Sequence, residues 1–221
     1  KPTSILAPEE ITTFGGSGNL SFEVEFGYSG TYSAQVHGLN LPLILDGFVA
    51  NDPTKTFSFR STAGVTQHVI SVPANQLYAR FALFDALTDG DPDDLDMYVY
   101  YCGTDGASCM KIGESGEPTS QERFDVYRPA EGFYAVMIHG FETDEIRGGP
   151  GANYQLLGWA FGITDDKGNM SASGPAFVAA GTTQTVTVDW TDLLGNTIYF
   201  GGISHNTPQG ISGLTLLTIG N

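Results

Sequence analysis

The sequence predicts an all-β protein built from two antiparallel β-sandwich modules of jelly-roll or immunoglobulin-like type, with one module inserted into the other. Many short stretches alternate apolar and polar residues, which is the pattern of half-buried strands. The 29 glycines and 11 prolines of the 221-residue chain supply frequent turns between these stretches. No segment keeps a helical period for more than about two turns. Short strands separated by turns in this way are typical of sandwiches and jelly rolls.

The first 48 residues contain two clear strand signals. Residues 20–26 read Leu-Ser-Phe-Glu-Val-Glu-Phe and alternate throughout. Residues 32–37 form the second signal, after a turn at 27–30 that begins and ends with glycine. Two strands are too few for a sandwich, so this part of the chain needs partners from elsewhere.

A continuous series of strand signals fills the middle of the chain. They lie at residues 56–60, 67–72, 77–84, 95–101, 122–127, 132–139 and 154–161. Alternation places Leu77, Ala79, Phe81 and Leu83 on one face of their strand. It likewise turns Leu95, Met97 and Val99 inward and Asp96, Tyr98 and Tyr100 outward. Residues 132–139 are the most hydrophobic, so we expect a central strand covered on both faces.

The last 60 residues supply a further set of strands. Residues 185–190 alternate with Val186, Val188 and Trp190 facing inward, and signals at 196–200 and 214–219 follow. Together with the first 48 residues they provide roughly 5–7 strands, the usual number for an immunoglobulin-like domain. We therefore expect a split domain of residues 1–48 plus 162–221, with a second domain of residues 49–161 inserted. Three consecutive small units or one continuous sheet stack are the alternatives.

The charge balance excludes some classes of partner. Nine lysines and arginines oppose 25 aspartates and glutamates, so the formal net charge is −16. Such a chain repels phosphate backbones and anionic lipid surfaces, and we expect neither nucleic acid nor a membrane as partner. No apolar run approaches the ~20 residues that cross a bilayer, and no signal peptide is visible. We expect a piece of a longer precursor whose export signal lies upstream.

Two cysteines, Cys102 and Cys109, lie close together in a glycine-containing segment. The glycines let the chain fold back, so the pair is expected to form a disulfide across the end of a hairpin; two free surface thiols are the alternative. The spacing, without nearby histidines, is a poor zinc signature. A disulfide implies an oxidising compartment, and hence a secreted, extracellular protein.

An acidic turn between two predicted strands is the candidate metal site. Calcium takes six to eight oxygen ligands, which carboxylates and turn carbonyls supply. The turn does not fit an EF-hand, because the required glycine and final glutamate are missing. The alternative is a solvated turn whose carboxylates cap backbone N–H groups. The candidate calcium ligands are Asp85, Asp89, Asp91, Asp93 and Asp94.

Four tyrosines form the candidate binding surface, namely Tyr98, Tyr100, Tyr127 and Tyr134. Tyrosine combines apolar area with a hydroxyl and suits protein or sugar surfaces, provided that the strands carrying it are neighbours. Cross-strand packing of these rings under a loop explains them without any ligand, and we favour this second interpretation.

The sequence predicts no catalytic residues. Neither Gly-Thr-Ser-Met-Ala nor Gly-x-Ser-x-Gly is present, and the nearest look-alike, residues 168–172, lies among strand signals. The four histidines His37, His68, His139 and His205 are scattered without metal-type spacing, so we expect structural roles for them.

Residues 94–100, 132–140 and 152–156 resemble the bacterial pre-peptidase C-terminal domain, and the likeness covers roughly residues 54–161. The flanking residues 47–53, 168–170, 201–205 and 210–214 resemble the C-terminal regions of bacterial subtilisin-like serine peptidases and their fibronectin type III-like modules. The segment 103–108 with its cysteines departs from the pattern.

The resemblance implies a jelly-roll-like sandwich and a non-catalytic accessory region of a secreted peptidase. Its partner would be a catalytic peptidase domain in cis, with a protein or matrix substrate as a further contact. The region would assist substrate binding, export, folding or regulation. A carbohydrate-binding module and a structural, adhesin-like spacer are the alternatives, because sandwiches carry all three functions.

Overall fold

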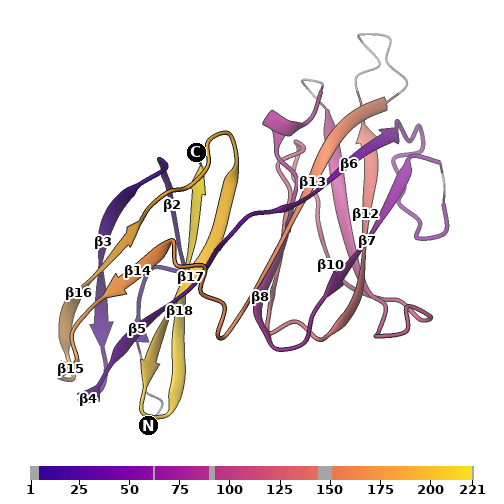
Figure 1. Cartoon of the computed structure of the whole chain (residues 1–221). Helices are drawn as coiled ribbons and strands as arrows, with labels where there is room; N and C mark the ends of the chain where they lie inside the picture. Colours follow the sequence, from indigo (N-terminus) through magenta and orange to yellow (C-terminus); the bar gives the residue numbers. More distant parts are fainter. Residues whose placement is uncertain (1–4, 62, 90–92, 144–150, 221) are drawn as a thin grey trace. The chain divides into compact units, whose positions relative to one another are not determined.

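The chain folds almost entirely into β-strands, which confirms the predicted all-β class. The computed structural model describes residues 5–61, 63–89, 93–143 and 151–220. Within these ranges the single helical element is the short 3-10 helix η1 (Asp85–Leu87). No helix in the described residues is long and apolar enough to span a membrane. The chain divides into two compact units (Figure 1): unit 1 is Lys1–Pro42 with Phe161–Asn221, and unit 2 is Leu43–Ala160.

Unit 1 is a sandwich of two four-stranded sheets with immunoglobulin strand order. One sheet has the order β1-β3-β16-β14, and the other has the order β2-β18-β17-β5. The strands are β1 (Ile5–Leu6), β2 (Glu10–Phe14), β3 (Gly18–Phe26), β5 (Ser33–Asn40), β14 (Met170–Ser173), β16 (Thr182–Trp190), β17 (Ile198–Thr207) and β18 (Gly210–Gly220). Without β2, which runs parallel to β18, this is the arrangement of a constant-type immunoglobulin domain. A two-stranded pair, β4 (Gly30–Thr31) with β15 (Phe177–Val178), completes the unit.

Alternating side chains build the core of unit 1. Val24 and Phe26 of β3 belong to one buried cluster with Val186, Val188 and Trp190 of the neighbouring strand β16. The prediction that these three residues of β16 point inward is confirmed. The residues between them are mostly exposed, as expected for sheets with one solvated face.

Unit 2 is an eight-stranded jelly roll. Its sheets have the orders β10-β9-β12-β7 and β11-β8-β13-β6. The strands are β6 (Leu43–Ala50), β7 (Val65–Val72), β8 (Gln76–Ala82), β9 (Asp94–Tyr101), β10 (Met110–Ser115), β11 (Arg123–Tyr127), β12 (Gly132–Glu142) and β13 (Gly151–Gly162). In chain order these orders are 5-4-7-2 and 6-3-8-1, the pattern of two interlocked Greek keys.

The inner faces of both sheets of unit 2 follow the sequence pattern. Leu95, Met97 and Val99 of β9 are fully buried, and Leu77 and Ala79 of β8 are as well. The hydrophobic strand β12 lies between β9 and β7, which confirms its predicted central position.

Two expectations about unit 2 need correction. The inserted unit begins at Leu43 rather than at residue 49, because β6 pairs with β13 from Leu43↔Gly158 to Ala50↔Gly151. The predicted strand at 56–60 is a loop, although its residues alternate between apolar and polar. Its apolar members, Phe57 and Phe59, pack on the sheet below without pairing as a strand.

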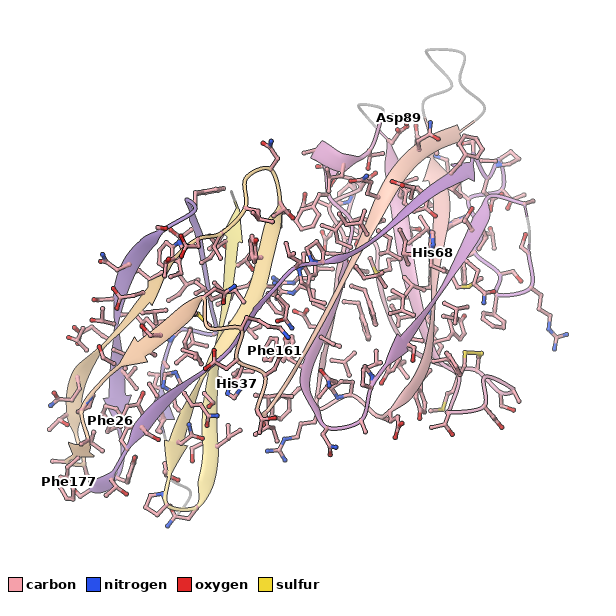
Figure 2. The ribbon with its side chains drawn as sticks, viewed as in Figure 1. Phe26, His37, His68, Asp89, Phe161 and Phe177 are labelled. Atoms are coloured by element: carbon pink, nitrogen blue, oxygen red, sulfur yellow. A yellow bond between two sulfur atoms is a disulfide. The ribbon has the colours of Figure 1, made fainter. Side chains whose placement is uncertain are left out.

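The predicted disulfide between Cys102 and Cys109 is present and closes the connection between β9 and β10 (Figure 2). Replacing both cysteines by serine is expected to lower the free energy of unfolding of unit 2 by about 2 kcal/mol, because the unfolded chain regains the entropy of the closed loop. Urea unfolding with and without reductant measures this. The double variant should no longer respond to reductant. A urea midpoint of the variant equal to that of the parent would contradict the expectation.

Candidate functional site

The aspartates of the acidic turn do not gather into a metal site in the part of the chain that the structure describes. Asp85 begins η1, whereas the Asp89 carboxylate accepts hydrogen bonds from the backbone N–H (2.9 Å) and the side-chain amide of Asn153. Asp91 lies outside the described residues. Among the described residues, no group of three His, Cys, Asp or Glu side chains is placed to hold a metal ion.

The four candidate tyrosines lie in three different places. Tyr134 is buried in the core, where its hydroxyl donates to the carbonyl of Ala130 (2.9 Å). Tyr127 is exposed on β11, in the opposite sheet. Tyr98 and Tyr100 lie on the outer face of β9, so the four candidate tyrosines do not form one surface.

A loop of the chain covers Tyr98 and Tyr100, as the packing interpretation expects for this pair. The ring of Phe57 stacks on Tyr98 with a centroid separation of 3.7 Å and an interplanar angle of 6°. Phe59 packs on Tyr100 at 4.3 Å. These two contacts explain the outward-facing tyrosines without a ligand.

The covering segment, residues 52–64, is an Ω-loop whose two ends meet at Gly140 of β12. The N–H of Asp52 donates to the carbonyl of Gly140 (2.8 Å), and the N–H of Gly140 donates to the carbonyl of Gly64 (3.0 Å). Ends held this closely are the defining property of such loops. Residue 62 lies outside the described residues.

The Asp52 carboxylate organises the start of this loop. It accepts hydrogen bonds from the N–H (2.9 Å) and hydroxyl (2.8 Å) of Thr54 and from the N–H of Thr56 (3.2 Å). It also contacts Nε2 of His139 at 2.9 Å. The hydrogen bonds from His139 and Thr54 hold the pKa of Asp52 well below its usual range, so the carboxylate is ionised.

His139 is completely buried and joins two carboxylates from different parts of unit 2. Its Nε2 lies 2.9 Å from Asp52 Oδ2, and its Nδ1 lies 3.3 Å from Asp96 Oδ2. Burial alone would lower the pKa of His139. The hydrogen bonds to Asp96 and Asp52 raise it by more than burial lowers it, so the net shift of the pKa is upward. A ring that donates to a carboxylate from each nitrogen is the imidazolium ion. A positive charge is therefore buried in unit 2 between the carboxylates of Asp52 and Asp96.

An acidic pocket of about 420 Å³ opens beside this cluster, formed by β9, β12, the end of β10 and the segment that follows it. Its charged and aromatic lining consists of Asp94, Asp96, Tyr98, Glu114, Glu117 and Phe141. Burial raises the pKa of Asp94 to about 6, with help from the charges of Asp96 and Glu142. Deeper in the protein, burial raises the pKa of Glu122 to about 7, although its carboxylate accepts from the Ser115 hydroxyl and from the Glu117 N–H (2.6 Å).

Two lysines of the chain already lie against aromatic rings at this pocket. Lys111 pairs with Glu114 and places Nζ 4.9 Å from the centre of the Tyr98 ring. Lys55 of the Ω-loop pairs with Glu142 and lies 4.9 Å from the centre of the Phe141 ring. Carboxylates beside aromatic faces attract cations. The carboxylates and aromatic rings of the site therefore attract cations. Its buried acids, Asp94 and Glu122, keep their protons to a higher pH than usual.

These buried acids make stability depend on pH. The ordinary pKa values of Asp94 and Glu122, 3.8 and 4.5, are raised to about 6 and about 7 in the folded chain. Between these values the folded chain keeps protons that the unfolded chain has released, so stability falls as the pH rises from about 4 to about 7. The raised pKa of His139 acts in the same direction above its ordinary value. The lowered pKa of Asp52 matters only below about pH 4.

We therefore expect unit 2 to be more stable at about pH 5.5 than at about pH 8, by on the order of 2 kcal/mol after allowance for solvent screening of Asp94. Denaturant unfolding at several pH values measures this. Glu122→Gln should flatten the profile by removing one of the two titrating acids, and the exposed Glu131→Gln should leave it unchanged. Stability that is constant or rises over this pH interval would contradict the assignment.

The described residues of unit 1 include a hydrogen-bonded histidine–serine pair, which belongs to the core. His37 Nε2 and the Ser204 hydroxyl lie 2.8 Å apart, and both residues are completely buried. The His37 ring stacks on Phe161; both residues are labelled in Figure 2. Burial lowers the pKa of His37 and of His205, the latter to about 4. A serine buried in this way does not meet a substrate, so the pair supports no catalytic assignment.

A second pocket of about 430 Å³ lies at β6, β13 and the segment around η1. Gln155 donates from its side-chain amide to Asp46 Oδ1 (2.9 Å), and Asn153 holds Asp89 as described above. Paired carboxylates and amides are groups that hydrogen-bond to hydroxyls.

Sequence reasoning missed Asp52, His139 and Glu122 as members of the site. Asp52 and His139 are 87 residues apart, so no local spacing signals their contact. The usable signal was weak: an aspartate in an Asn-Asp-Pro turn and a histidine within a strongly apolar strand.

No family model matches the chain, and no curated protein matches it. Among solved structures, the chain is similar to PliG of Aeromonas hydrophila, a periplasmic lysozyme inhibitor of g-type lysozyme. The two share 11% identity with a TM-score of 0.32, and the match covers 59% of this chain and 87% of that chain. A likeness of this size supports no functional argument, so the fold assignment rests on the strand orders.

Proposed function

We propose that the chain is the non-catalytic C-terminal accessory region of a secreted subtilisin-like peptidase and works in cis with the catalytic domain. The observation that supports this most is the resemblance of residues 94–100, 132–140 and 152–156 to the pre-peptidase C-terminal domain. These segments fall on β9, β12 and the start of β13 of the jelly roll. A jelly-roll-like sandwich is the fold that the resemblance implies.

The Cys102–Cys109 disulfide supports the exported location that this proposal requires, since such bonds persist in oxidising compartments. The accessory role would consist of contact with a protein or matrix substrate, help in export or folding, or regulation of the catalytic domain. Nucleic acid and membranes are not among the proposed partners, because of the net charge of −16.

A carbohydrate-binding module is the second candidate. The pocket with Asp46, Asp89, Asn153 and Gln155 favours it, because paired carboxylate and amide groups suit sugar hydroxyls. The tyrosines do not favour it, since Tyr98 and Tyr100 are covered and Tyr134 is buried.

Retention on insoluble matrices separates these candidates. The purified chain should be retained on collagen or elastin and pass through chitin and cellulose. Retention on a polysaccharide alone, lost in Asn153→Ala and Gln155→Ala variants, would contradict the accessory role and support the sugar-binding one. Retention on no matrix would leave a structural spacer and would likewise contradict substrate contact.

Calcium remains part of the proposal for the acidic turn on the strength of its composition, Asp85 to Asp94. Bound calcium would stabilise the folded chain by mass action, so excess calcium should raise the melting temperature and EDTA should lower it. Excess magnesium is the control, because it demands a stricter octahedral geometry. A melting temperature that ignores both calcium and EDTA would exclude the site.

A further inference from the structure

The Ω-loop 52–64 lies over the only two candidate tyrosines on the outer face of β9, and a single buried histidine connects its anchor to the sheet. Phe57 and Phe59 cover Tyr98 and Tyr100, while Asp52 fixes the first turn of the loop through Thr54 and Thr56. We propose that His139 is a pH-operated latch: its doubly bonded, charged ring holds the Ω-loop closed over these tyrosines, and loss of its proton loosens the loop.

The geometry requires two N–H groups on the ring. Asp52 approaches Nε2 from the loop, and Asp96 approaches Nδ1 from β9, each as a hydrogen-bond acceptor. A neutral imidazole has one N–H, so its other nitrogen would direct a lone pair at a carboxylate. Deprotonation therefore replaces one attractive contact by a repulsive one. It also leaves Asp52 and Asp96 without the positive charge between them.

The remaining charged groups around the latch favour the protonated ring. On β9, Asp94 lies near enough to interact electrostatically with His139, and the Tyr98 hydroxyl donates to Asp96 (3.4 Å). On β12, Glu142 is paired with Lys55, which belongs to the Ω-loop itself. On β10, Glu114 is paired with Lys111. From the neighbouring strand β7, the residue paired with His139 is the uncharged Val65.

The expected consequence is local opening with the sandwich intact. The described part of the loop contains no strand and is mostly exposed outside Asp52 and Gly64. Segments of this kind open at lower free energy than the strands beneath them. Opening uncovers the rings of Tyr98 and Tyr100, which the closed loop shields through Phe57 and Phe59.

Hydrogen exchange of the whole chain tests the latch. The N–H groups of Thr54 and Thr56, which donate to Asp52, should exchange about tenfold to a hundredfold faster at about pH 9 than at about pH 6, after correction for intrinsic base catalysis. The amide of Val136, in the centre of β12, should keep its protection. His139→Gln should exchange quickly at the loop at every pH. His68→Gln, which alters a histidine bonded to the Tyr154 hydroxyl, should keep the wild-type profile.

Nitrogen NMR of the wild-type ring keeps the proposal testable if the His139 variant does not fold. Both ring nitrogens of His139 should carry protons at about pH 6, and one proton should be lost over the same pH interval in which Thr54 and Thr56 lose protection. A neutral ring at about pH 6, or loop protection that does not change as His139 loses its proton, would overturn the proposal.

Discussion

Replacing His139 by alanine is expected to lower the free energy of unfolding of unit 2 by about 3–5 kcal/mol, the largest loss of any single substitution considered for this protein. Asp52 is 4% exposed and is bonded to the ring that the substitution removes. The variant leaves this buried carboxylate without its cationic partner and facing Asp96 across the vacated space. Removing one member of a buried ion pair costs far more than removing both.

The indole fluorescence of Trp159 reports on unit 2 when Trp190, the tryptophan of unit 1, is replaced by phenylalanine. In that background, urea unfolding should place His139→Ala well below the parent. His68→Ala is the matched control and should lose about 1 kcal/mol, because it removes one neutral hydrogen bond. Adding Asp52→Asn to His139→Ala should recover part of the loss. If His139→Ala costs no more than His68→Ala, the buried ion pair does not exist.

Gly140→Ala is expected to lower the free energy of unfolding of unit 2 by about 3 kcal/mol, the second-largest loss. A Cβ at Gly140 would lie 2.3 Å from the carbonyl oxygen of Ala50. That oxygen belongs to the backbone of β6 and cannot move aside as a side chain can. Because both ends of the Ω-loop bond to Gly140, the substitution also displaces the loop anchors at Asp52 and Gly64.

Thermal unfolding of Gly140→Ala beside Gly195→Ala measures this effect. A Cβ at Gly195 meets no atom within 4 Å, so the control should stay within about 0.5 kcal/mol of the parent. Faster exchange of the Thr54 amide in Gly140→Ala would show that the loop is displaced as well. A Gly140→Ala protein that melts like the control would mean that β6 and β12 do not approach each other this closely.

Much of the fold could be predicted because one-sided burial leaves a period of two in the sequence. Val186, Val188 and Trp190, and likewise Leu95, Met97 and Val99, are buried as the pattern requires. The disulfide followed from a short separation with glycines between the cysteines. Both are local signals, and local geometry decides them.

The same alternation was misleading where side chains are covered although their backbone is not paired in a strand. Phe57 and Phe59 alternate because their rings pack on Tyr98 and Tyr100, although the segment between them is a loop. Strand β6 was missed as a whole for the opposite reason, since it begins with the consecutive apolar residues Leu43, Ile44 and Leu45 without alternation. Periodicity reports which side chains are covered, and hydrogen-bond pairing must be learned from the structure.

The candidate site was the least predictable part, because its members come from distant segments. Composition pointed to the acidic turn, and Asp94 does line the pocket. Asp89 instead turns to Asn153, which the jelly-roll connection brings beside it. The contact of Asp52 with His139 depends on the Ω-loop returning to β12, and no local pattern encodes that return.

The measurement that tests the proposed function most directly is the DNA sequence of the reading frame that encodes Lys1. The account predicts an export signal and a subtilisin-like catalytic domain upstream in the same frame. A frame in which a different enzyme or no catalytic domain precedes Lys1 would contradict an accessory role in cis with a peptidase.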